Sequence, residues 1–124
     1  MNTKFYICKH CGQIIETVKH TGVPVICCGE IMEELVAGTT DATVEKHVPV
    51  YTVNGNTVKV VVGSVEHPMT PEHYIEWIVL ETSNGTQRKQ LSPNTKPETE
   101  FAILDGETVE AVYAYCNLHS LWKA

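Results

Sequence analysis

The 124-residue sequence has no long apolar run and carries little positive charge. No stretch approaches the roughly 18 apolar residues that a membrane-spanning helix needs. The opening residues, MNTKFYICKHC, also lack the apolar segment of a secretory signal. The formal net charge of −6 argues against a nucleic-acid surface, which requires a basic patch. We therefore expect a cytoplasmic protein that binds neither a membrane nor nucleic acid.

Apolar residues at helical spacing are also missing, and the pattern after residue 40 is that of β-strands. The strands are expected within residues 48–53, 56–63, 73–82, 86–91 and 100–116, with the last range split by a turn at Asp105-Gly106. Asn54-Gly55 predicts a hairpin with a type I′ turn. The two prolines in residues 67–73 predict a loop. Strands of this length at turn-marked intervals predict a small antiparallel β-sandwich.

A run of small residues at positions 37–40 predicts a boundary between two domains. Residues 1–36 hold four of the five cysteines, and residues 37–124 hold the predicted strands. The first segment is too short to bury enough apolar surface to fold alone, so we expect a metal ion to hold it together. Two histidines of this segment, His10 and His20, are expected to be exposed polar residues.

The N-terminal cysteines are spaced for metal binding. Cys8 and Cys11 form a C-x-x-C knuckle with Gly12 behind it, and the adjacent pair Cys27-Cys28 follows after fifteen residues. The spacing resembles a zinc ribbon, but a ribbon would have a second C-x-x-C. Two adjacent cysteines can bind one ion only with a strained geometry. Zinc and iron both accept four thiolates in a tetrahedron, so spacing does not separate them. A disulfide between the first two cysteines is the alternative.

Cys116 stands apart from the other cysteines and shares the second domain with four histidines. The histidines are His47, His67, His73 and His119. His47 and His73 are each expected to begin a strand, and His67 is expected to end one. Cys116 and His119 are expected to close the last strand. Taken singly, each histidine could be a surface residue and the cysteine a buried core residue. Because strand ends meet at one end of a sandwich, we expect these side chains to form one site.

Four imidazoles and one thiolate exceed the four ligands of structural zinc and suit a redox metal such as iron or copper. A β-sandwich with C-x-x-H near its C-terminus resembles blue-copper proteins, but those add a methionine after the histidine. Residues 120–124 contain no methionine, and two histidines would be left over, so iron is favoured. With the imidazoles in a plane and Cys116 axial, iron keeps an open sixth position, toward which the thiolate pushes electron density.

Several motifs together resemble one known family. The motifs EKHVP (45–49), EHPM (66–69), EHYIEW (72–77) and CNLHSLW (116–122), with the four N-terminal cysteines, resemble desulfoferrodoxin, the two-iron form of superoxide reductase. The resemblance spans nearly the whole chain and holds at every ligand position. It implies a desulforedoxin-like domain in residues 1–36 and an immunoglobulin-like antiparallel β-sandwich in residues 37–124, usually assembled as a homodimer.

The resemblance also implies two iron ions per chain. The first would be held by Cys8, Cys11, Cys27 and Cys28, and the second, catalytic iron by His47, His67, His73, His119 and Cys116. Superoxide would take one electron at the open position of the second iron, and hydrogen peroxide would leave after two protons are added. A rubredoxin-like protein would re-reduce the iron. The first iron would be structural, with possible electron storage.

Glu45 and Lys46 gain roles from the same resemblance. Glu45 resembles the carboxylate that occupies the sixth position once the iron is ferric. Lys46 resembles the lysine that draws in the anion and helps to position water for protonation. An acidic protein repels small anions at long range, so local positive charge at Lys46 agrees with this role. Without the resemblance, the two residues read as an ordinary exposed charged pair.

The residues leave two other functions open. In a non-catalytic electron-transfer protein, both metals would carry electrons without binding a substrate, and small anions would not bind. In a zinc-stapled interaction domain, the protein would be colourless.

Overall fold

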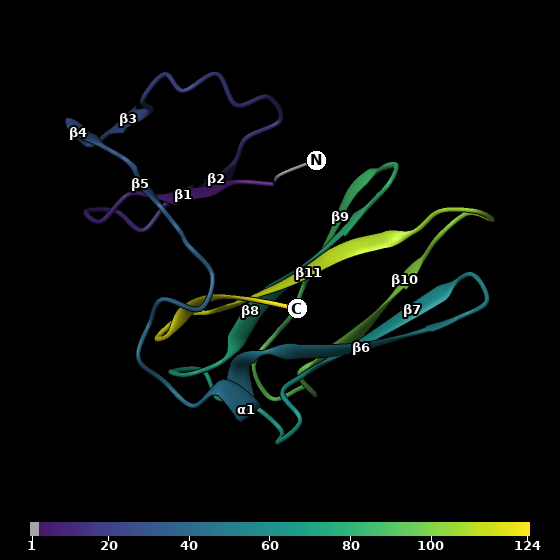
Figure 1. Cartoon of the computed structure of the whole chain (residues 1–124). Coiled ribbons are helices and arrows are strands. Elements are labelled where there is room, and N and C mark those ends of the chain that lie inside the picture. Colours follow the sequence, from purple (N-terminus) through teal and green to yellow (C-terminus); the bar gives the residue numbers. More distant parts are fainter. Residues whose placement is uncertain (1–2) are drawn as a thin grey trace. The chain divides into compact units, whose positions relative to one another are not determined.

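The computed structural model describes residues 3–124, which divide into two compact units with the boundary between Val36 and Ala37 (Figure 1). Strands make up nearly all of the regular structure in both units, as the sequence predicts. Among residues 3–124, no helix has the length and apolar character needed to cross a membrane.

The N-terminal unit consists of short strands around very little buried apolar surface. Its strands are β1 (Phe5–Ile7), β2 (Ile14–Glu16), β3 (Ile26–Cys27), β4 (Glu30–Ile31) and β5 (Glu33–Glu34). β1 lies between β2 and β5 in an antiparallel sheet, and β3 and β4 form a separate hairpin. Among the described residues of this unit, Phe5, Cys8 and Met32 are the buried hydrophobic ones. So small a core cannot offset the entropy of folding, which favours a structural metal.

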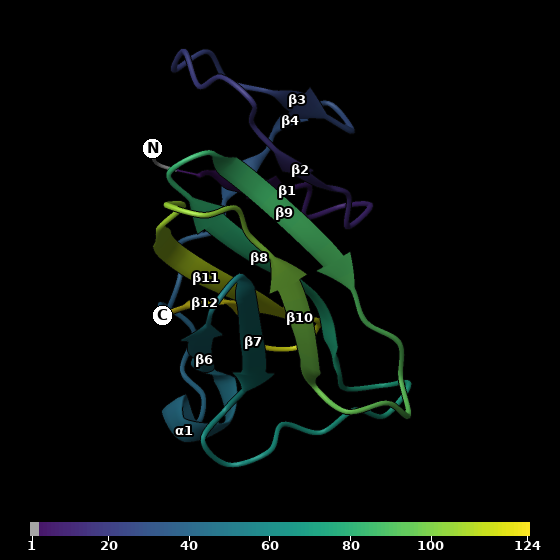
Figure 2. The ribbon, with the colours of Figure 1, turned by 90° about the vertical axis from the view of Figure 1, so that its right-hand side faces the viewer.

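The second unit is an antiparallel β-sandwich of the immunoglobulin-like kind that was predicted (Figure 2). Its elements are α1 (Val44–His47), β6 (Pro49–Asn54), β7 (Thr57–Val62), β8 (Ile75–Thr82), β9 (Gly85–Gln90), β10 (Glu98–Ala102), β11 (Val109–Cys116) and β12 (Ser120–Lys123). One sheet has the strand order β10-β7-β6 and the other the order β12-β11-β8-β9. All strand pairs are antiparallel.

The core lies between the two sheets and fixes the strand ends. Along β7, the fully buried Val58, Val60 and Val62 alternate with more exposed residues, which is the period of two expected of a half-buried strand. These valines belong to one buried cluster with Ile78 and Leu80 of β8. Because this core sets the register of the strands, it also sets where the connecting loops emerge.

Two local predictions were wrong. Val44–His47 form a short helix, so His47 ends a helix instead of opening a strand. Asn54 pairs with Thr57, which makes Gly55 and Asn56 the central residues of the β6–β7 turn. Of these two described residues, Gly55 alone has a positive φ, 61°, whereas a type I′ turn needs positive φ at both. Glycine at the first central position is the pattern of a type II′ turn.

Candidate metal centres

The four N-terminal cysteines come together within the first unit. Cys8 follows β1 directly, and Cys11 lies in a turn closed by a hydrogen bond from Gly12 N–H to Cys8 O (2.9 Å). Cys27 ends β3 and Cys28 lies in the turn before β4. The four sulfurs lie within 4.8 Å of one another. Those of Cys11 and Cys27 are 3.7 Å apart, close to the roughly 3.8 Å between two thiolates on one tetrahedral ion at about 2.3 Å.

The backbone accommodates the adjacent cysteine pair by a left-handed turn. Cys28 has a φ of 53°, and Gly29 after it has a φ of 76°. A non-glycine residue in this region costs about 1–2 kcal/mol. The turn allows the sulfurs of Cys27 and Cys28 to share one group despite their adjacency. Local backbone strain therefore allows two adjacent cysteines to reach one site.

The cysteine protonation states favour a bound cation. The pKa of Cys8 is lowered to about 6, chiefly because its sulfur accepts a hydrogen bond from the backbone N–H of Cys11, with a further one from His10. The pKa of Cys27 is raised to about 12, because the sulfurs of Cys8 and Cys11 lie against it. Four thiolates at this spacing repel one another unless a metal ion neutralises them, so the donor set fits a tetrahedral thiolate site.

His10 and His20 lie outside both donor sets. Each is exposed, as predicted. The Nε2 atom of His10 lies 3.0 Å from Oε2 of Glu30, and the ring of His20 stacks on that of Tyr6.

The second group gathers from distant segments of the sandwich. His47 ends α1, Cys116 ends β11, and His119 lies in the turn before β12. His67 and His73 both lie in the loop between β7, which ends at Val62, and β8, which begins at Ile75. The expectation that these two histidines bound strands was therefore wrong. The expectation that Cys116 closes a strand is confirmed.

The four imidazole rings of this group form a square. The centroids of neighbouring rings are separated by 4.6 Å (His47–His67), 4.8 Å (His67–His73), 5.1 Å (His73–His119) and 4.9 Å (His119–His47). Across the square, His47 and His73 are 6.5 Å apart. In a tetrahedron all separations would be similar, so the longer separation of His47 and His73 fits a square and not a tetrahedron. Neighbouring rings are nearly perpendicular, at 75° to 88°.

Hydrogen bonds fix which nitrogens face the centre. His47 Nδ1–H donates to Thr43 O and His67 Nδ1–H donates to Pro68 O, each at 2.7 Å. In the neutral rings, the lone pairs therefore lie on the two Nε2 atoms, which are only 3.1 Å apart. His119 presents Nδ1 instead, 3.1 Å from His47 Nε2. Two ligands at right angles on one metal, at about 2.1 Å, are roughly 3.0 Å apart.

Burial disfavours a proton between these nitrogens. Burial lowers the pKa of His67 to about 4, and it also lowers the pKa values of His47 and His73. The Nε2 atom of His73 is buried and has no hydrogen-bond partner among the described residues. Lone pairs that face one another without protons need a metal ion, so this donor set fits one.

Cys116 lies off the plane of the square. Its sulfur is within 4.8 Å of a nitrogen of each of His47, His67 and His73, and 4.0 Å from His119 Nδ1. A sulfur this close to opposite corners lies above or below the square and not beyond one edge. The side chain is fully buried, and burial raises the pKa of the thiol, whereas the backbone N–H groups of Leu118 and His119 lower it. Four imidazoles and one thiolate exceed the four ligands of tetrahedral zinc, so this donor set would suit iron.

Glu45 and Lys46 lie on α1 directly before His47, and both side chains are exposed. Besides burial, the positive charge of Lys46 contributes to the lowered pKa of His47 and of His73. The ammonium group therefore acts electrostatically on the imidazole square. The backbone of Glu45 is held by a hydrogen bond from Val65 N–H to Glu45 O (3.0 Å).

Trp122 and Thr43 support the site, although the sequence motifs predicted no role for either residue. The ring of buried Trp122 stacks on His47, with centroids 4.9 Å apart, and its Nε1–H donates to His119 O (2.9 Å). Thr43 acts through its backbone carbonyl, which accepts the proton of His47 Nδ1. Such partners orient ligands and raise their basicity.

The fold and the two donor sets define a class of protein: a β-sandwich metalloprotein with a four-cysteine unit at its N-terminus. The sequence model of the desulfoferrodoxin family matches residues 39–124. The chain is 50% identical to desulfoferrodoxin of Clostridium acetobutylicum over 119 residues, which cover 96% of this chain and 93% of that protein. It is 46% identical over 121 residues to desulfoferrodoxin of Nitratidesulfovibrio vulgaris, and these residues cover 98% of this chain and 94% of that protein. The chain therefore belongs to the desulfoferrodoxin family.

Solved structures support the same assignment. The structure of the superoxide reductase of Treponema pallidum matches with a TM-score of 0.85 and 40% sequence identity. The match covers 100% of this chain and 99% of that chain. The superoxide reductase of Giardia intestinalis, described as having one iron, is 37% identical with a TM-score of 0.55, and it covers 64% of this chain and 95% of its own.

Proposed function

We propose that this chain is a superoxide reductase, which converts superoxide to hydrogen peroxide with one electron and two protons. The observation that carries the proposal is the imidazole square with the buried Cys116 sulfur off its plane, in a chain of the desulfoferrodoxin family. Similarity to proteins named superoxide reductase supports it. Two iron ions per chain, one for each donor set, are the expected cofactors.

An iron ion held in the second site would supply the electron that superoxide takes up. The ligands that we propose are His47, His67, His73, His119 and Cys116. Neutral imidazoles and one thiolate leave a divalent ion with a net charge near +1, which attracts a small anion. Because the Cys116 sulfur is buried on one side of the square, the substrate would bind on the other side.

Two exposed residues of α1 serve this side of the square. Lys46 adds positive charge on an acidic protein, so it draws in the anion and holds water near the proton-accepting oxygen. Glu45 is the carboxylate that closes the site after the product leaves. Both proposals are supported by their place next to His47 and by the electrostatic action of Lys46 on the square.

The four-cysteine site, formed by Cys8, Cys11, Cys27 and Cys28, holds the N-terminal unit together. The small buried core of that unit supports this structural role. Re-reduction of the second iron requires an electron donor, and a rubredoxin-like protein fits the role. Exposed apolar side chains of Val44, Val65 and Leu118 lie on the segments that carry the site and suit a small, transient interface. We place the reaction in the cytoplasm.

A second copy of the chain is the proposed assembly partner. β6 is an edge strand with exposed Val50 and Val53, a surface prone to pairing. Light scattering should give the mass of a dimer.

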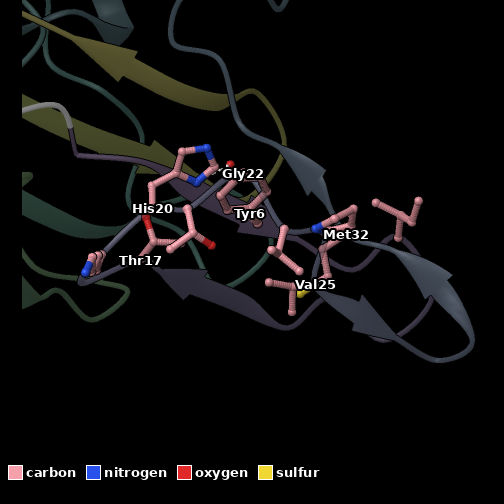
Figure 3. Close-up of a pocket in the computed structure, with 11 residues that line it drawn as sticks. Tyr6, Thr17, His20, Gly22, Val25 and Met32 are labelled. Atoms are coloured by element: carbon pink, nitrogen blue, oxygen red, sulfur yellow. Dashed lines mark hydrogen bonds between the residues drawn. The ribbon is translucent and has the colours of Figure 1, made fainter.

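The N-terminal unit has a cavity of about 560 Å³, with Tyr6, His20 and Val25 in its lining (Figure 3).

The experiment that tests the function combines metal analysis, visible spectra and the reaction with superoxide. We expect two irons per chain, with thiolate-to-Fe(III) bands that appear in two stages on oxidation, and a fast reaction with superoxide. Cys116→Ser should lose the band of the second iron and the reaction. A second iron that binds neither azide nor cyanide would indicate electron transfer alone, and a colourless zinc protein would contradict the proposal.

A further inference from the structure

We propose that Asn117 is a positioning residue that holds His73 at its corner of the imidazole square. This inference rests on the proposed metal site and adds a residue to its supporting shell. Asn117 directly follows Cys116, so one residue would couple the proposed sulfur ligand to the proposed imidazole ligand His73.

The strand pairing between β8 and β11 is interrupted where the two ligands lie. Tyr115 pairs with Trp77, but the next residue, Cys116, pairs with Ile75, so Glu76 is left without a partner across the ladder. This register shift is a β-bulge, and regular pairing ends at Cys116 and Ile75. His73 lies two residues beyond the end of the ladder, so the ladder does not hold it.

The Asn117 side chain continues the connection past the bulge. Its Oδ1 accepts a hydrogen bond from Tyr74 N–H (3.0 Å), and its Nδ2–H donates to Glu72 O (2.9 Å). The backbone N–H of Asn117 also donates to Tyr74 O (3.3 Å). These bonds engage the residues on both sides of His73, so the amide brackets the backbone that carries the imidazole.

A comparison with the other imidazoles shows why the hydrogen bonds of Asn117 matter. His47 and His67 are each anchored through Nδ1 to a backbone carbonyl at 2.7 Å. The backbone of His73 pairs with Thr70 within the same loop, so these bonds do not join His73 to a strand. Asn117 ties the loop to β11. The hydrogen bonds to Tyr74 N–H and Glu72 O need one acceptor and one donor, which an amide supplies and a carboxylate does not.

The test compares Asn117→Ala, Asn117→Asp and the control Asn84→Ala in the full-length, iron-loaded protein. Asn84 is exposed in the turn at the other end of β8. The affinity for the second iron is measured by chelator competition, together with the ferric EPR signal and the thiolate-to-Fe(III) band. Loss of a residue that supports a metal ligand typically costs 10–100-fold in metal affinity. The four-cysteine iron of the same chain is an internal control.

We expect Asn117→Ala to weaken the second iron about 10–100-fold, to alter its EPR signal, and to speed hydrogen exchange of the Tyr74 amide. Asn117→Asp keeps the acceptor for Tyr74 N–H and loses the donor to Glu72 O, so its affinity should be intermediate. Asn84→Ala should match the wild type.

Wild-type affinity and an unchanged EPR signal in Asn117→Ala would overturn the positioning role alone. If Asn117→Ala unfolds the second unit, Asn117→Asp decides: intermediate affinity supports the role and wild-type affinity overturns it. A wild-type protein that binds no second iron would overturn the proposed function together with this role.

Discussion

His67 shows how a single side chain is prepared for a metal ion. Its Nδ1–H is engaged by the Pro68 carbonyl, so the lone pair of the neutral ring lies on Nε2. The residue is 2% exposed, and burial lowers its pKa to about 4. The imidazole therefore stays neutral and ready to bind a metal well below neutral pH.

This depressed pKa predicts loss of stability in acid. The unfolded chain takes up a proton at His67 near pH 6.5, whereas the folded metal-free protein does so only near pH 4. Stability is therefore full above pH 6.5 and declines as the pH falls toward 4, with about 2 kcal/mol lost between pH 7 and pH 5. Urea unfolding of the metal-free protein at several pH values measures it. His67→Gln should flatten the profile, and identical slopes would contradict the assignment.

Lys46 should act on the rate of encounter with superoxide. Lys46→Ile removes positive charge beside the square, so the second-order rate constant should fall about tenfold at low salt and depend less on ionic strength. Pulse radiolysis measures this rate. Lys89→Ile on β9 changes the net charge equally and should leave most of the rate intact. An equal loss in both variants would mean that overall charge, and not Lys46, steers the anion.

At the scale of elements, the site depends on how closely α1 approaches the loop between β7 and β8. Gly63 follows β7 with a φ of +86°. A Cβ atom built there would lie 2.3 Å from Val65 O and 2.8 Å from both Glu45 O and Lys46 O. Only glycine therefore allows this loop to lie against the backbone that carries Glu45 and Lys46.

Gly63→Ala should disturb both the fold and the substrate mouth. The left-handed φ costs about 1–2 kcal/mol for alanine, and displacement of three carbonyls adds to it, so we expect about 2–4 kcal/mol of destabilisation. Gly106→Ala is the matched control, because Gly106 has a φ of +81° and no atom within 4 Å of the added carbon. Thermal unfolding and the superoxide rate are measured for both. Equal effects would show that φ strain alone matters.

At the scale of the whole molecule, each unit contains its own donor set. Cys11→Ser removes a ligand from the four-cysteine site of Met1–Val36, and no proposed ligand of the second iron lies in that unit. We expect residues 3–36 to lose protection in hydrogen exchange, while the superoxide rate constant stays within about twofold of the wild type. A large loss of the superoxide reaction would show that the first site takes part in catalysis.

The sequence by itself determined the β class and the sandwich, and it predicted which cysteines and histidines would form the two sites. Apolar alternation and turn residues act locally, so they are readable without the fold. The short helix at Val44–His47 was missed because four residues show no helical periodicity. The partners Thr43, Pro68 and Trp122 were also missed, since two of them act through backbone carbonyls that any residue supplies.

Only the tertiary structure decided the geometry of the second site. His47 and His119 are separated by 72 positions in the chain, yet their nitrogens are 3.1 Å apart. Sequence spacing fixes which residues exist, but the distance between loops follows from strand register and core packing. The imidazole square, the off-plane sulfur of Cys116 and the choice of Nδ1 at His119 are therefore properties of the packed sandwich, since each depends on contacts between segments that are remote along the chain.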